Sequence, residues 1–133
     1  MSYLLDTDMF SAIALERSPS ATRRLHEIAE GEIAISVVTL AEIRSGIAWK
    51  PLHARALAKI EAALRLIRTL PLGLDVAPRY ATIRAHLQRK GTPIGPNDLW
   101  LAAHALAEDL TLVTGNQREF KRVPTLRVEN WTG

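Results

Sequence analysis

Four acidic residues and one amide lie where the apolar segments of this 133-residue chain end or begin: Asp6, Glu42, Asp98, Asn116 and Glu119. Asp6 closes the first apolar run, and Glu42 lies one turn into the helix expected after the second. Asp98 opens a helix that leads into a further run, which Asn116 and Glu119 follow. Because sites in open parallel α/β sheets form beyond the carboxyl ends of the strands, we expect these side chains to share a cleft.

Several carboxylates in one cleft repel one another, so they need a cation or some must take up protons. A set of oxygen ligands suits a hard cation, Mg²⁺ or Mn²⁺. Such an ion beside a phosphate neutralises charge on the phosphoryl oxygens and lowers the pKa of the attacking water. The acids together therefore favour phosphodiester cleavage.

Each acid also has a simpler structural interpretation. Asp6 could end a strand and accept a hydrogen bond from a turn amide. Thr39-x-x-Glu42 matches a capping box, in which the Glu42 side chain bonds back to the Thr39 amide. Asp98 could be an acid favoured by the dipole of a first helical turn, and Glu119 a solvated surface acid. No single position decides between the interpretations, so the prediction depends on the joint arrangement.

Other catalytic chemistries have weaker support. The chain has no cysteine, which excludes disulfides, thiolate metal sites and a Cys nucleophile. Its histidines fall on separate expected helices without a His-x-x-x-His pair, so a zinc site is not expected: His26, His53, His86 and His104. His104 is six residues past Asp98 on one expected helix, points to a different side and is interpreted as structural. No glycine-rich phosphate-binding motif occurs.

Short apolar runs alternate with helical patterns along the chain. We expect strands at residues 3–5, 33–36 (extended at most to 38), 72–76, 110–114 and, weakly, 126–128. We expect helices at residues 9–16, 20–30, 39–46, 52–70, 78–90 and 98–109, with Gly91 ending the fifth and a capping residue, Asn97, before the sixth. This alternation predicts an α/β fold with a mainly parallel sheet of four to five strands, flanked by helices on both faces.

Size and composition suit one domain spanning residues 1–133. The net charge is +3, and the surface outside an acidic metal site would be clearly positive, as a binder of phosphate backbones requires. We expect neither a signal peptide nor a membrane span, and the absence of cysteine fits a reducing cytosol. Candidates for contacts with a phosphate backbone are Arg23, Arg24, Arg44, Lys50, Arg84, Arg89, Lys90 and Arg118.

Several motifs, in order over nearly the whole chain, resemble the VapC family of PIN-domain toxins. They are Leu5-Asp6-Thr7, the segment from Ser36 to Glu42, Ile94 to Asp98, Ala102 to Ala105, Leu112 to Asn116, Arg118 to Phe120 and Val128 to Trp131. The resemblance implies a PIN-domain-like three-layer sandwich, an Mg²⁺ or Mn²⁺ site and a homodimer. It also implies an endoribonuclease that cuts tRNA or ribosomal RNA in the cytoplasm of a bacterium or archaeon, inhibited by a VapB-like antitoxin.

The resemblance also assigns roles to residues. Asp6, Glu42 and Asp98 match the acids that bind metal, and Glu119 is the nearest match to a further catalytic acid that many members place after the fourth strand. Asn116 and Thr7 are supporting polar residues in the same motifs. Gly115 departs from the asparagine that is commoner in the family.

Two alternatives belong to other functional classes. A PIN fold without catalysis could bind RNA or a protein, although clustered carboxylates without a use carry an electrostatic cost. Asp6-Thr7-Asp8 after a strand also resembles the haloacid-dehalogenase phosphatases. Those enzymes typically follow the second Asp with a hydrophobic residue and a Thr, whereas Met9-Phe10 stands here.

Overall fold

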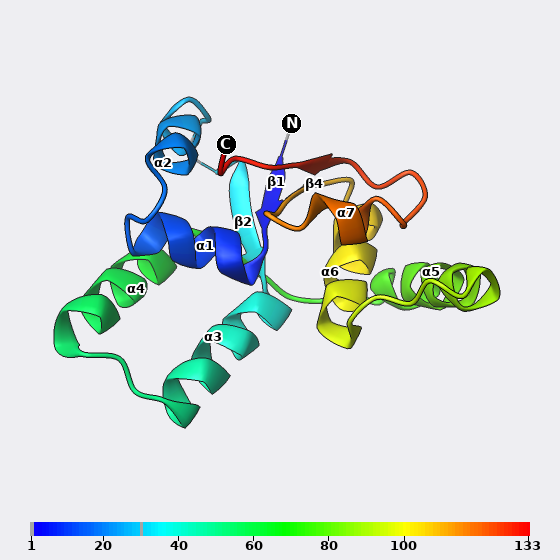
Figure 1. Cartoon of the computed structure of the whole chain (residues 1–133), viewed down its shortest axis with the longest axis horizontal. Helices are drawn as coiled ribbons and strands as arrows, with labels where there is room; N and C mark the ends of the chain where they lie inside the picture. The colour runs from blue at the N-terminus through cyan, green and yellow to red at the C-terminus, as the bar shows by residue number, and fades with distance from the viewer. Residues whose placement is uncertain (1, 30) are drawn as a thin grey trace.

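The computed structural model describes residues 2–29 and 31–133. These residues form five strands and seven helices, arranged as a central sheet between two helical layers (Figure 1). The strands are β1 (Tyr3–Leu5), β2 (Ile33–Ser36), β3 (Arg68–Leu70), β4 (Thr111–Val113) and β5 (Val128–Glu129). The helices are α1 (Thr7–Ala14), α2 (Pro19–His26), α3 (Val37–Trp49), α4 (Ala54–Leu66), α5 (Val76–Lys90), α6 (Pro96–Ala107) and α7 (Gln117–Phe120). The predicted α/β architecture is confirmed.

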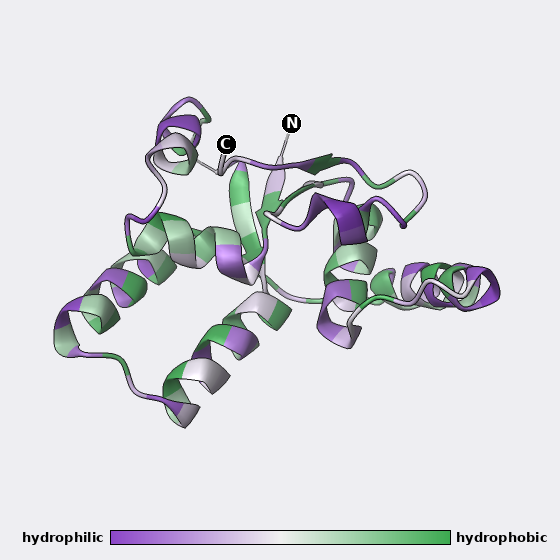
Figure 2. Cartoon of the chain, in the orientation of Figure 1, coloured by the Kyte–Doolittle hydropathy of each residue, from purple (hydrophilic) through white to green (hydrophobic). Residues whose placement is uncertain are grey.

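The five strands are parallel and lie in the order β3-β2-β1-β4-β5. Consecutive side chains of a strand point to opposite faces, and the core divides accordingly. Leu4, Ala34 and Leu112 pack against α5 and α6 on one face. Leu5, Ile35 and their neighbours pack against α1, α3 and α4 on the other. Figure 2 shows β2 and most of α1 as hydrophobic, whereas α7 is hydrophilic.

The order of the strands determines where a cleft can form. From β1 the chain moves outward to β2 and β3, then returns to the opposite side of β1 as β4. The direction of strand addition therefore changes between β1 and β4. Ligands in open α/β sheets bind beyond the carboxyl ends of strands at such a point.

Two sequence predictions about strands are wrong. The third strand is not residues 72–76 but Arg68–Leu70, which pairs with β2 and is separated from the end of α4 by a single residue. The long helix predicted over residues 52–70 is correspondingly shorter. Val37 and Val38 do not extend β2, because the Ser36 hydroxyl accepts a hydrogen bond from the Val38 amide and starts α3 there.

Other helix ends also differ from the prediction. Asp6 caps α1, so this helix begins at Thr7, and α2 ends at His26 rather than near residue 30, which lies outside the described residues. Asn97 is not a capping residue: Gly95 takes that position and α6 begins at Pro96. Gly91 ends α5 in the left-handed conformation, as predicted.

In the described part of the chain, no helix is sufficiently long and apolar to cross a membrane.

Candidate functional site: an acidic cleft at the ends of the strands

Asp6 lies at the carboxyl end of β1 and is largely buried, with 8% of its surface exposed. Its Oδ1 accepts a hydrogen bond from the Met9 amide at 2.8 Å, and the Thr114 hydroxyl also bonds to the carboxylate. Burial raises the pKa of Asp6 despite these hydrogen bonds, and the charges of Asp8 and Glu42 raise it further. Asp6 does follow a strand and accept a hydrogen bond from a backbone amide, but that amide lies in the first turn of α1, so Asp6 is a helix cap rather than a turn residue. It also lies within the field of the other acids.

Glu42 lies inside α3 and does not form the capping box that Thr39-x-x-Glu42 suggested. Ser36 caps this helix, and Thr39 is buried within its first turn. The Oε1 of Glu42 instead accepts a hydrogen bond from the Thr7 hydroxyl at 2.6 Å. Thr7, at the start of α1, thus holds the Glu42 carboxylate beside the end of β1.

Asp98 lies in the first turn of α6, as its helix-start interpretation also expects. Its pKa is nevertheless raised to about 7, first by burial, then by the charge of Glu119 and by a hydrogen bond with it, and then by Glu42 and Asp6. A hydrogen bond between two carboxyl groups requires a proton on one of them. The charges of the other three acids of the cleft thus all contribute to the raised pKa of Asp98.

Glu119, on α7, is half-buried rather than a solvated surface acid. Its Oε1 accepts a hydrogen bond from the Gly95 amide at 3.0 Å, and its Oε2 accepts one from Asn116 Nδ2 at 2.6 Å. Asn116 and Glu119, three residues apart, therefore meet at the first turn of α7. The contact with Gly95 connects α7 to the residue that precedes α6, and Asp98 lies in the first turn of that helix.

Two polar partners of the acids were not singled out from the sequence, and only one of them, Thr114, has a sequence signal. Thr114 is the first residue after β4, buried, and bonds to Asp6. Its position directly after the apolar run Leu110–Val113 is equivalent to that of Asp6 after β1. The Gly95 amide that binds Glu119 has no comparable signal, because every residue except proline has an amide.

His104 is buried and structural, as predicted. Its Nδ1 lies 2.8 Å from Ser36 Oγ and its Nε2 lies 2.5 Å from Glu108 Oε2. This resembles a Ser-His-acid triad, but the Ser36 hydroxyl is fully buried and already caps α3, so it is not placed to attack a substrate.

Two of the basic residues considered for phosphate contacts are already engaged within the chain. Arg44 forms an ion pair with Glu61. Arg24 lies over the rings of Tyr3 and Trp131, 5.7 Å from each ring centre. Both arginines therefore have structural roles in this conformation.

The structure thus brings four carboxylates from four separate elements into one electrostatic group: Asp6, Glu42, Asp98 and Glu119. Their donors are all oxygens, which fits Mg²⁺ or Mn²⁺. In the described part of the chain, no three Asp, Glu or His side chains are arranged so that they could hold a metal ion as they stand. Because the acids repel one another, they would have to turn toward a common cation for it to bind.

The chain is similar to known PIN-domain proteins over nearly its whole length. The PIN domain family matches residues 3–126. The tRNA(fMet)-specific endonuclease VapC of Shigella flexneri is 36% identical over 132 residues, covering 99% of each chain. Ribonuclease VapC2 of Rickettsia felis is 37% identical over 133 residues, covering 98% of each.

A solved structure agrees with these relatives. VapBC2 from Rickettsia felis, crystallised with a DNA fragment from its promoter, contains a chain that superposes with a TM-score of 0.90 at 34% identity. The superposition covers 98% of this chain and 99% of that one. The similarity therefore includes every element that carries an acid of the cleft.

Proposed function

Since this chain belongs to the VapC ribonucleases, a family built on the PIN domain, we propose that its acidic cleft is where it hydrolyses RNA phosphodiester bonds. The chain is the toxin endoribonuclease of a type II toxin–antitoxin system. The observation that carries the assignment to the cleft is the convergence of four carboxylates around Asp98, whose pKa is raised to about 7 first by burial and then by the charges of Glu119, Glu42 and Asp6. A cluster of this kind is an electrostatic cost unless a cation offsets it.

The residues of the cleft fit a divalent cation. PIN-domain ribonucleases generally depend on such an ion, and we propose Mg²⁺ or Mn²⁺ for this one. Asp6, Glu42 and Asp98 would hold it, with Glu119 as a further acid nearby. When bound, the ion would neutralise charge on the phosphate and lower the pKa of the attacking water.

The protein groups have separable tasks in this proposal. Thr7 fixes the Glu42 carboxylate through its 2.6 Å hydrogen bond, and the Met9 amide fixes that of Asp6. Asn116 and the Gly95 amide hold Glu119. Positioned carboxylates of this kind can accept a proton from the attacking water or orient it toward the phosphate.

The substrate and partners follow from the relatives. A relative named as specific for tRNA(fMet) supports tRNA as the RNA class cut here. The solved relative is a VapBC complex, which supports a VapB antitoxin as the protein partner. We also propose a homodimer acting in the cytoplasm, as expected from the sequence.

The alternatives have less support. The relatives at 36–37% identity are named as nucleases, which favours catalysis over a binding module. The phosphatase interpretation would need Asp8 as a general acid beside Asp6, but Asp8 is exposed on α1 and the chain matches the PIN domain.

Sequencing RNA 5′ ends after brief expression tests the proposal. The wild type should create new 5′ ends at defined positions, and Asp98→Asn, expressed to the same soluble level, should not. The same ends in both samples would overturn the assignment of the cleft.

A further inference from the structure

A hollow of about 670 Å³ lies between α3 and α6, directly beside the acidic cleft. Its lining includes Val38, Glu42 and Trp49 from α3, Leu72 after β3, and Asn97 and Trp100 from α6. Apart from Glu42, these side chains are apolar, aromatic or neutral amides. We call this feature the tryptophan hollow.

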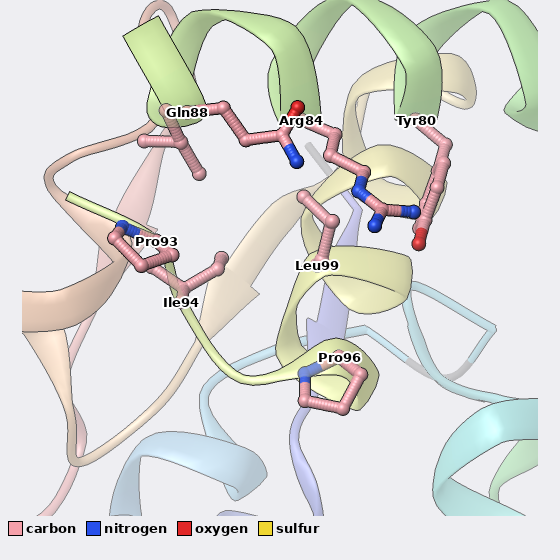
Figure 3. Close-up of a pocket in the computed structure, with 8 residues that line it drawn as sticks. Tyr80, Arg84, Gln88, Pro93, Ile94, Pro96 and Leu99 are labelled. Carbon is pink, nitrogen blue, oxygen red and sulfur yellow. The ribbon is translucent and has the colours of Figure 1, made fainter. Parts of the chain in front are cut away.

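Its two tryptophans differ in how they are held. Trp49, at the end of α3, has 88% of its surface exposed. Trp100 is half-buried and stacks on Tyr80 of α5, with ring centres 4.0 Å apart and planes 24° apart. Figure 3 shows Tyr80 and Arg84 extending from α5 beside a separate hollow of about 280 Å³ that they line with Leu99. Tyr80 thus holds the Trp100 ring in place from behind, while the Trp49 ring is left in solvent.

A nearly fully exposed tryptophan is unusual, since aromatic side chains are normally covered by the protein or by what it binds. Here the exposed ring belongs to a hollow that also contains a carboxylate of the cleft, Glu42. Asn97 precedes Asp98 in the same helical turn and lines the hollow too. A nucleotide whose phosphate lies at the acids would therefore have its base within reach of the tryptophans.

The opposite side of Glu42 has a different character. A second hollow, between α1 and α3, contains Glu42 and Thr7 together with two cations, Arg17 and Lys50, and is otherwise lined mainly by aliphatic side chains. Those cations suit phosphates, whereas the tryptophan hollow has no basic residue in its lining. The contrast favours a base, rather than a phosphate, on the tryptophan side.

We propose that the tryptophan hollow binds an unpaired base of the RNA next to the phosphate that is cut, by stacking on Trp49 and Trp100. Proteins that recognise single-stranded RNA stack splayed bases on aromatic rings in this way. The inference rests on the proposed ribonuclease function and adds a substrate subsite to it. It requires that the RNA be unpaired at the cut, as in a loop.

Two short probes separate base stacking from phosphate binding. One is an eight-nucleotide oligoadenylate, and the other is an eight-unit abasic spacer chain that keeps the phosphates but has no bases. Binding of each to the full-length chain is measured by anisotropy with Ca²⁺ present. The variants are Trp49→Ala, Trp49→Phe and, as a matched control, Leu66→Ala, since Leu66 is 83% exposed on a different helix.

Trp49→Ala should bind oligoadenylate about 5- to 150-fold more weakly, the range expected for losing one stacked base, and should bind the abasic chain as the wild type does. Trp49→Phe should restore most of the affinity, and Leu66→Ala should change neither probe. Because Trp49 is exposed, truncating it should leave the melting temperature unchanged.

Three results would overturn the subsite. Unchanged oligoadenylate binding by Trp49→Ala would show that no base stacks on Trp49. Equal loss of both probes would show that Trp49 does not contact a base. Conversion of a dimer to a monomer by Trp49→Ala, seen by light scattering, would assign the hollow to contact with a second copy of the chain. Cleavage of tRNA by the wild type in Mn²⁺, measured alongside, reports separately on the proposed function.

Discussion

Asp98→Asn should stabilise the protein at alkaline pH when no divalent cation is present. The pKa of Asp98 is raised from 3.8 to about 7, so the folded state holds its proton more tightly than the unfolded chain. Below about pH 4 both states are protonated and the effect on stability vanishes. Between pH 4 and 7 the unfolded chain ionises first, so this group lowers the free energy of unfolding as the pH rises, and the full cost is present above pH 7.

The size of the effect follows from the same pKa. At about 1.36 kcal/mol per pKa unit the ceiling is about 4 kcal/mol. Asp98 is half-buried and solvent screens its charge, and an acid in a first helical turn gains up to about 1 kcal/mol that Asn would lose. We therefore expect a gain of about 1–2 kcal/mol at pH 8, or very roughly 3–10 °C in melting temperature.

The assay is thermal unfolding of wild type and Asp98→Asn at pH 4.5 and pH 8, each with EDTA or with Mn²⁺. With EDTA the variant should be the more stable at pH 8 and nearly equal to the wild type at pH 4.5. Mn²⁺ should stabilise the wild type by about 2.7 kcal/mol at 100 times its Kd and the variant much less. A variant less stable than the wild type at pH 8 in EDTA, or stabilised equally by Mn²⁺, would refute the electrostatic reasoning.

Three further predictions concern the other acids and the partner. Glu42→Gln keeps an oxygen that can accept the hydrogen bond from the Thr7 hydroxyl, so the melting temperature should stay unchanged while RNA cleavage falls by orders of magnitude. Cleavage at the wild-type rate would show that Glu42 has only a structural role. Glu119→Gln should impair cleavage less than Asp98→Asn, with partial recovery at high Mn²⁺, and identical rates at every metal concentration would remove Glu119 from the site. Expression of the chain alone should arrest bacterial growth, and co-expression of its VapB antitoxin should relieve the arrest; an unaffected growth curve at high soluble expression would contradict a toxin.

The sequence was sufficient to predict the sheet where a buried strand has a strong local signal. β1, β2 and β4 are short, largely apolar segments, and a polar residue ends β2 and follows β1 and β4. The acids after these strands could therefore be assigned to one edge of the sheet. β3 is misplaced in the sequence prediction because it is an edge strand with the sequence Arg-Thr-Leu and Arg68 exposed, so it carries no apolar run. Ile67 and Leu70 also continue the helical spacing of the apolar residues in α4. For this reason the sequence pattern does not indicate that the helix ends at Leu66.

Caps and site contacts were harder to predict because they depend on the tertiary structure. Ser36 and Thr39 are both acceptable helix caps by type, and only the folded chain shows that Ser36 takes the position, in contact with His104. Glu119 likewise accepts a hydrogen bond from the Gly95 amide, which is 24 residues away in sequence. Such contacts leave no periodic pattern for a sequence analysis to detect.

Cleavage of RNA at the carboxylate cleft should depend on a divalent cation. The most direct test incubates the purified chain with tRNA in Mn²⁺, in Mn²⁺ with excess EDTA, and in Mn²⁺ with Asp98→Asn in place of the wild type. Discrete fragments are expected in the first sample, none in the second, and a loss of cleavage by orders of magnitude in the third. Undiminished cleavage in excess chelator, or by the folded variant, would contradict it.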